Sequence, residues 1–170
     1  MTGLRLRRAV PADRAALAEL LGGLSPESSY RRFQAALGPT PRASVLTALL
    51  PEGSRGGAML AYDGPDLVGH GVWRRAGTAP VAEIGLVVAD AHQGRGVGTA
   101  LTEALISDLT ARGVERVEVF ATATNEAVAR MVARRAPDAV RERDGATVTY
   151  VFPVQPTRAR TVARRLGCRP

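Results

Sequence analysis

Three glycines spaced two residues apart lie between an apolar run and a helical pattern. They occur in the segment Gln93-Gly94-Arg95-Gly96-Val97-Gly98. Glycine has no Cβ, so backbone N–H groups can approach a ligand closely there. A helix N-terminus adds unpaired donors and the positive end of a dipole. The segment therefore predicts a cradle for phosphate, although the same glycines could serve only a tight turn between a strand and a helix.

Two common phosphate-binding loops do not fit this segment. No Gly-Lys-Ser/Thr follows the glycines, so the loop is not the one found in nucleoside triphosphatases. A dinucleotide-binding fingerprint follows the first strand of a βαβ unit. Here three strand patterns of an antiparallel meander come first, which argues against that class.

One carboxylate interrupts the apolar run before the loop. Glu83 stands in Val81-Ala82-Glu83-Ile84, ten residues before Gln93. A carboxylate among apolar neighbours is costly unless it is paired or lines a cleft. Glu83 is therefore the leading candidate for acid–base chemistry. The alternative is a structural position at an edge, or an ion pair with an arginine.

The surrounding pattern predicts the elements that hold these residues. Apolar residues at helical spacing and cap signals predict helices, whereas alternating and β-rich runs bounded by turn residues predict strands. The expected strands cover 4–10, 58–62, 67–75, 81–88, 114–120, 140–143 and 148–152. The expected helices begin at Pro11, after the cap Ser25 and after the glycine loop, and two more cover 45–50 and 125–135. This order of elements predicts a single mixed α/β domain.

The basic charge is concentrated near the C-terminus. All 23 cations are arginine, against 16 acids, for a net charge of +7. Residues 1–129 hold 13 of each sign, and residues 153–170 hold five arginines and no acid. We therefore expect a domain over 1–152 and a tail over 153–170, which is either solvated, an arm for a partner or part of an anion site. This distribution weakens the nucleic-acid role that net charge alone would suggest.

Composition excludes several other classes. Apolar content of 45% and charged content of 23% are ordinary for a globular domain. No apolar stretch approaches the length of a transmembrane helix, and the first ten residues lack the apolar core of a secretory signal. The single cysteine, Cys168, excludes an internal disulfide and a cysteine-based zinc site. We expect a cytoplasmic protein without a metal or a membrane partner.

At this point the residues resemble a family. Gln93, Gly96 and Gly98, placed after the strand Val-Ala-Glu-Ile-Gly-Leu-Val-Val, resemble motif A of the GNAT superfamily of acyl-CoA-dependent N-acetyltransferases. The resemblance covers roughly residues 4–152. It implies an α/β fold with a mixed, mostly antiparallel central sheet, helices on both faces and a splayed strand pair that admits acyl-CoA.

The resemblance also implies a binding site for acetyl-CoA. The pantetheine arm would pair with the backbone of Leu86, Val87 and Val88. The pyrophosphate would rest on the amides of Gly94, Arg95, Gly96, Val97, Gly98 and Thr99. The Arg95 side chain would meet a phosphate or face solvent. Asn125, the only asparagine, stands where family members place a cofactor contact, and it is also a good helix N-cap.

Acetyl transfer to an amine needs a base. A lysine ammonium has a pKa of about 10.4, so its neutral form is disfavoured by roughly 4–5 kcal/mol at pH 7. Glu83 would remove that proton directly or through water, and the N–H near Val88 would polarise the thioester. Many members protonate the leaving thiolate with a tyrosine, but Val132 occupies that position. His70 is expected to be packed and His92 to lie on the surface.

A second run bears on the acceptor. Residues 24–33, Leu-Ser-Pro-Glu-Ser-Ser-Tyr-Arg-Arg-Phe, resemble a stretch in bacterial protein lysine acetyltransferases that modify acyl-CoA synthetases. The resemblance implies a protein lysine as acceptor, with Tyr30, Arg31 and Phe33 as substrate-binding candidates, although Tyr30 and Phe33 could simply pack together. The alternatives are a small amine such as a polyamine or aminoglycoside, or a non-catalytic module that binds acyl-CoA or nucleic acid. The sequence allows a monomer or a homodimer.

Overall fold

The computed structural model describes residues 3–35, 37–75, 77 and 79–154, so Cys168 and nearly all of the predicted tail lie outside the described residues. Seven strands, five α-helices and two short 3-10 turns are assigned within them. In chain order they are β1 (Leu4–Arg8), η1 (Pro11–Asp13), α1 (Arg14–Gly22), α2 (Pro26–Phe33), α3 (Ala43–Leu49), β2 (Gly56–Asp63), β3 (Asp66–Arg75), β4 (Val81–Val88), η2 (Asp90–His92), α4 (Val97–Ala111), β5 (Arg116–Thr122), α5 (Glu126–Arg135), β6 (Val140–Asp144) and β7 (Thr147–Pro153).

All the strands form one sheet in the order β1-β2-β3-β4-β5-β7-β6. Every neighbouring pair is antiparallel except β4 and β5, which run parallel. The parallel pair is joined through the glycine loop and α4, as a crossover connection requires. The predicted mixed, mostly antiparallel sheet is therefore confirmed.

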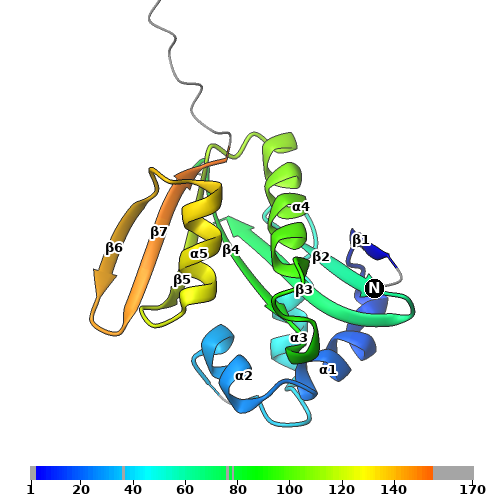
Figure 1. Cartoon of the computed structure of the whole chain (residues 1–170). Helices are drawn as coiled ribbons and strands as arrows, with labels where there is room; N and C mark the ends of the chain where they lie inside the picture. The colour runs from blue at the N-terminus through cyan, green and yellow to red at the C-terminus, as the bar shows by residue number, and fades with distance from the viewer. Residues whose placement is uncertain (1–2, 36, 76, 78, 155–170) are drawn as a thin grey trace, which may run out of the picture.

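Helices cover both faces of this sheet, and alternation along β4 shows how. Ala82 and Ile84 enter a core with α4 and α5 on one face, and Figure 1 shows these two helices in front of the strands. Val87 enters a second core with α1 and α3 on the other face. Glu83 and Gly85 share the face of Val87 because successive strand residues point to opposite sides.

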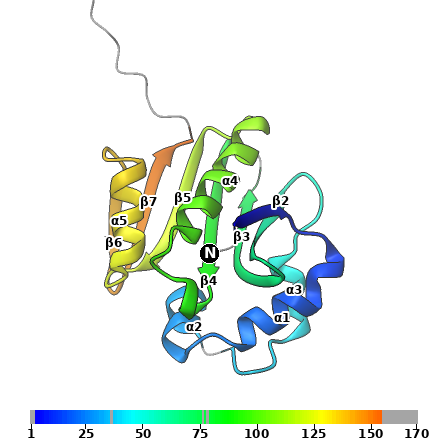
Figure 2. The same ribbon diagram turned by 45° about the vertical axis from the view of Figure 1, so that its right-hand side comes forward.

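Strands β4 and β5 are paired with each other only over their N-terminal halves. Residues Val81 to Ile84 of β4 are in register with Arg116 to Val119 of β5. Beyond Ile84, β4 pairs only with β3, and beyond Val119, β5 pairs only with β7. The two strands separate toward their C-terminal ends, which are at the bottom of Figure 2. The predicted splayed pair is present.

Helix α2 lies at the open ends of the two parted strands (Figure 1) and contacts both β4 and β5. Its first residue follows the predicted cap, because the Ser25 side chain accepts a hydrogen bond from the Ser28 amide and Pro26 occupies the first helical position. A helix that enters the fold next to the gap is placed to border whatever ligand the gap receives.

Candidate active site

Two residues of the glycine loop have backbone conformations that favour glycine. Gly94 and Gly96 have φ of 73° and 85°, which side chains rarely adopt. A Cβ at either position would meet nothing within 4 Å. The backbone conformation, rather than crowding by the protein, therefore calls for glycine, and the space over both residues is open to a ligand.

The first turn of α4 also has free donors. Gly96 is its N-cap residue and supplies no side-chain cap. Among the described residues, no hydrogen bond engages the amides of Gly94, Arg95 or Gly96. Together with the positive end of the α4 dipole, such donors fit a pyrophosphate. The unpaired edge of β4 at Leu86, Val87 and Val88 fits an amide-bearing chain laid alongside it.

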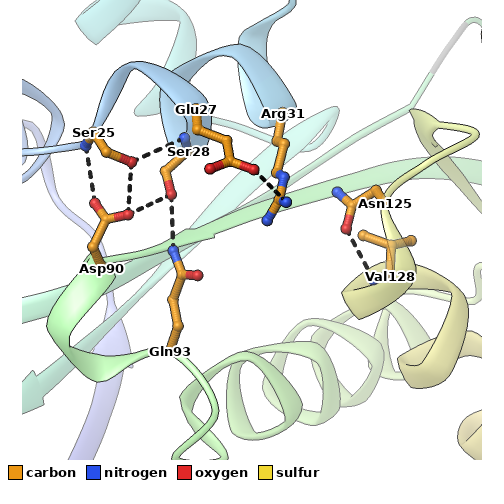
Figure 3. A network of polar contacts seen from close by, with 8 residues as sticks. All are labelled: Ser25, Glu27, Ser28, Arg31, Asp90, Gln93, Asn125 and Val128. Carbon is orange, nitrogen blue, oxygen red and sulfur yellow. Dashed lines mark hydrogen bonds and ion pairs between the residues drawn. The ribbon is translucent and has the colours of Figure 1, made fainter.

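The loop is tied to α2 by a polar network drawn in Figure 3. The Asp90 carboxylate accepts hydrogen bonds from the Ser25 amide at 2.9 Å, the Ser25 hydroxyl at 2.8 Å and the Ser28 hydroxyl at 2.6 Å. The Gln93 side chain donates to the Ser28 hydroxyl at 3.0 Å and to the Val88 carbonyl at 3.1 Å. Sequence reasoning did not single out Asp90 or Ser28, and its candidate Gln93 uses its side chain as a brace.

This network holds Asp90 in its ionised form. Partial burial would raise the pKa of the carboxyl, but hydrogen bonds from Ser28 and Ser25 outweigh that effect and lower the pKa below its ordinary value. A carboxylate that accepts this many hydrogen bonds is an acceptor only, so it anchors both the start of α2 and the segment before the loop.

Asn125 caps α5, as one of the two expectations had it. Its Oδ1 accepts a hydrogen bond from the Val128 amide at 3.2 Å. The side chain lies at the start of α5, across the gap from α2 (Figure 3). The cap leaves the side-chain Nδ2 of Asn125 without a hydrogen bond to any described residue. A contact with a cofactor remains a prediction.

Glu83 lies near the middle of the sheet and lines a pocket of about 250 Å³. In register it stands between Arg74 of β3 and Glu118 of β5. Its side chain is exposed and makes no ion pair within 4.0 Å in the part of the chain that the structure describes. The pocket walls come from α2, α3, β3 and β4, namely Arg32, Ala48, Leu49, Val72, Arg74, Glu83 and Gly85. Glu83 therefore belongs to a cleft rather than to a structural ion pair.

The pocket contains an arginine that the sequence analysis passed over. Arg32 is half-buried, and desolvation of its guanidinium lowers the pKa of that group, partly offset by the nearby charge of Glu83. Helical spacing could have revealed it, since Arg32 lies four residues after Ser28 and three after Ser29, which are both buried. Arg32 therefore shares the inward face of α2.

The three acceptor-binding candidates on α2 lie elsewhere. Tyr30 is 54% exposed, and Arg31, which is also exposed, pairs with Glu27 of the same helix at 2.5 Å. Phe33 packs partly buried against the core that α1 and α3 share, with the Arg32 guanidinium 5.0 Å from its ring centre. None of them lines the pocket, so their part in binding an acceptor stays a prediction.

The other candidate acids and bases serve the fold. His70 is fully buried, and its Nε2 lies 2.8 Å from the Leu49 carbonyl, as expected of a packed histidine. His92 is half-buried 3.8 Å from Asp63 rather than fully on the surface. Val132 is buried in the core and offers no proton. Among the described residues no cluster of His, Cys, Asp or Glu could hold a metal ion.

Comparison with known proteins identifies the family of the chain. The model of the GNAT acetyltransferase family matches residues 25–136. The chain belongs to this family. No helix in the described part of this GNAT acetyltransferase is long and apolar enough to cross a membrane.

One curated protein and two solved structures are among the similar proteins. "Acetyltransferase Pat" of Mycolicibacterium smegmatis is 30% identical over 159 residues, which cover 86% of this chain and 44% of that protein. The chain thus spans less than half the length of this curated relative. The crystal structure of the GNAT domain of S. lividans PAT superposes with a TM-score of 0.80 at 25% identity, over 88% of this chain and 90% of that one. A cAMP-binding acyltransferase from Mycobacterium smegmatis superposes with a TM-score of 0.61 at 25% identity, over 90% of this chain and 44% of that one.

Proposed function

We propose that this protein transfers an acetyl group from acetyl-CoA directly to a primary amine, with Glu83 as general base. The observation that carries the proposal is the position of Glu83, which lines a pocket one residue before the last paired position of β4 and β5. When bound along the open edge of β4, acetyl-CoA supplies the thioester that accepts the amine. The free amides of the glycine loop, at the other end of that edge, suit its phosphates.

The protein's own groups would then remove one proton from the amine and stabilise the charge on the carbonyl oxygen of the thioester. Glu83 takes the proton from the ammonium, which frees the nitrogen lone pair. A backbone N–H on the open edge of β4 stabilises the charge that develops on the carbonyl oxygen. The new C–N bond forms as the C–S bond breaks, and the nitrogen loses its second proton. Water carries this proton to the thiolate, which leaves as coenzyme A. No side chain with an acidic proton occupies the Val132 position, which supports water as the proton source.

The test is the variant Glu83→Gln, which keeps the size of the side chain and removes the base. We expect kcat to fall by roughly 100-fold to 10,000-fold at pH 7, while the dissociation constant for acetyl-CoA measured by calorimetry stays the same. Glu118→Gln is the matched control, since Glu118 is the neighbour of Glu83 in register and does not line the pocket. Unchanged turnover in Glu83→Gln would refute Glu83 as the base.

We further propose a protein lysine as the acceptor, supported by similarity to the two Pat proteins and by the α2 sequence that borders the pocket. The experiment is transfer of radiolabelled acetyl groups to a panel of purified proteins, including acyl-CoA synthetases, and to small amines. Because this chain contains no lysine, label on its own side-chain amines cannot obscure the result. Label that enters only small amines would overturn the protein acceptor and leave the acetyltransferase assignment intact.

A further inference from the structure

The pocket beside Glu83 has an excess of positive charge. Two arginines, Arg32 and Arg74, and one carboxylate line it. Arg74 is exposed and donates to the Ala48 carbonyl at the end of α3. Arg32 is half-buried with its Nε shielded from solvent, and desolvation and the charge of Arg74 lower the pKa of its guanidinium, while the charge of Glu83 opposes them. A partly desolvated cation next to a second cation is costly unless an anion joins them.

Arg32 lacks the partners that such a cation requires. Its Nε is buried without a hydrogen-bond partner. Within the described residues no carboxylate lies within 4.0 Å of its guanidinium, although the charge of Glu83 acts on it from farther away and the ring of Phe33 lies beside it. Arg7, by contrast, pairs with both oxygens of Asp13 at 2.8 Å and 2.5 Å.

The guanidinium lies where the acyl group would arrive. A Cβ built on Gly85 would stand 2.5 Å from Nη2 and 2.6 Å from Cζ of Arg32, so the guanidinium rests directly against the Gly85 backbone. Gly85 is the first residue of β4 beyond its last pairing with β5. Arg32 therefore faces the point where the two strands part.

We propose that this pocket binds a carboxylate, which Arg32 engages with its planar fork and Arg74 supports. Arginine pairs with carboxylates through two parallel hydrogen bonds, and such pairs are strongest where water is excluded. One carboxylate would leave the pocket neutral overall, counting Glu83. The inference rests on the proposed acyl transfer, and the carboxylate comes either from the far end of a short dicarboxylic acyl chain or from the acceptor protein next to its lysine.

The first arm of the test compares acyl chains by calorimetry. Acetyl-CoA and succinyl-CoA are titrated into the wild-type protein and into Arg32→Gln. We expect succinyl-CoA to bind wild type at least about tenfold more tightly, as one charge-assisted pair would produce. The difference should vanish in Arg32→Gln, whereas affinity for acetyl-CoA changes little. Arg130→Gln is the control, because Arg130 is an exposed arginine paired with Glu126 on α5.

The second arm places the carboxylate on the acceptor. The blocked dipeptides Glu-Lys and Gln-Lys are compared as acceptors of acetyl groups. If the acceptor supplies the anion, kcat/KM favours Glu-Lys in wild type and Arg130→Gln and loses that preference in Arg32→Gln. A merely structural arginine would instead lower binding of every ligand equally when replaced. Thermal melting of Arg32→Gln shows whether the variant has a folding defect. The preferences of the wild-type protein test the carboxylate site even if that variant does not fold.

The outcomes separate the two proposals. If acetyl-CoA fails to bind wild type, the proposed function itself fails. If acetyl-CoA binds and is used, but neither succinyl-CoA nor Glu-Lys is preferred, the carboxylate site is overturned and the transferase stands. A preference that survives in Arg32→Gln also overturns the role of Arg32.

Discussion

The two ends of the open half of β4 offer a ligand different kinds of groups. At its C-terminal end the glycine loop presents backbone amides, with no side-chain cap on α4. At the other end the pocket presents charged side chains from three elements, Arg32, Arg74 and Glu83. A site made of backbone is sensitive to an added Cβ, whereas a site made of side chains is sensitive to a lost charge. Each end can therefore be changed by a substitution that removes no binding group from the other.

The largest effect is expected at the loop. Gly96→Val introduces a side chain where φ is 85° and where the ligand's space is open. We expect affinity for acetyl-CoA to fall by roughly 1000-fold, equivalent to about 4 kcal/mol. Gly145→Val is the matched control, since Gly145 also has positive φ and open space but lies in the β6–β7 turn. Both variants should lose similar stability, about 1–2 kcal/mol. Equal cofactor affinity in the two would contradict the loop assignment.

The next largest effect is the loss of folding stability at acidic pH that is caused by buried His70. His70 is in register with Val87, and burial lowers its pKa from 6.5 to about 4, with a hydrogen bond to Leu49 opposing and the charge of Arg32 assisting. As pH falls, the unfolded chain therefore binds a proton at this histidine at a higher pH than the folded chain does. The stability due to neutral His70 is complete above pH 6.5 and is lost as pH falls toward 4, by about 3 kcal/mol.

Urea unfolding at pH 7.0, 5.5 and 4.5 measures this loss. His70→Gln removes the titrating ring and should flatten the difference between these pH values, although it lowers stability at pH 7. An equally steep acid loss in His70→Gln would assign the effect to other groups.

A smaller effect tests whether the absence of a Cβ at Gly85 gives the Arg32 guanidinium its position. Gly85→Ala places a Cβ 2.5 Å from Nη2 of Arg32, which must swing away. The flexible end of an arginine moves easily, so we expect thermal stability to change little. Calorimetry should show that the preference for succinyl-CoA falls about tenfold while acetyl-CoA binds as before. A retained preference would mean that Arg32 acts from elsewhere than the Gly85 backbone.

The smallest effect lies in the network that joins the two ends. Ser28→Ala removes one donor to Asp90 and the acceptor for Gln93. We expect a loss of about 1 kcal/mol in urea unfolding at pH 7, and a rise in the pKa of Asp90 toward its ordinary 3.8. The contribution of ionised Asp90 is complete above 3.8 and disappears as pH falls through the lowered pKa. Ser44→Ala, an exposed change on α3, should be nearly neutral.

The same contrast explains what could be predicted from the sequence. The glycine loop is a contiguous segment whose residue types follow from backbone conformation, so Gly94 and Gly96 were identified without tertiary information. Glu83 was identified because it contradicts its apolar strand. Arg32 was not, because α2, α3 and β3 approach β4 only in the folded chain. The sheet order was predictable in outline, but the exchange of β6 and β7 next to β5 depends on long-range pairing.

The hydrogen bonds that bind Asp90 and Gln93 to α2 have a consequence for the order in which ligands act. They make the segment before the phosphate loop and the helix beside the pocket parts of one hydrogen-bonded unit. If filling the loop orders this unit, part of the entropy cost of ordering α2 for an acceptor has already been met. Coupling between two binding sites is reciprocal. The factor by which a bound cofactor strengthens acceptor binding must then equal the factor by which a bound acceptor strengthens cofactor binding.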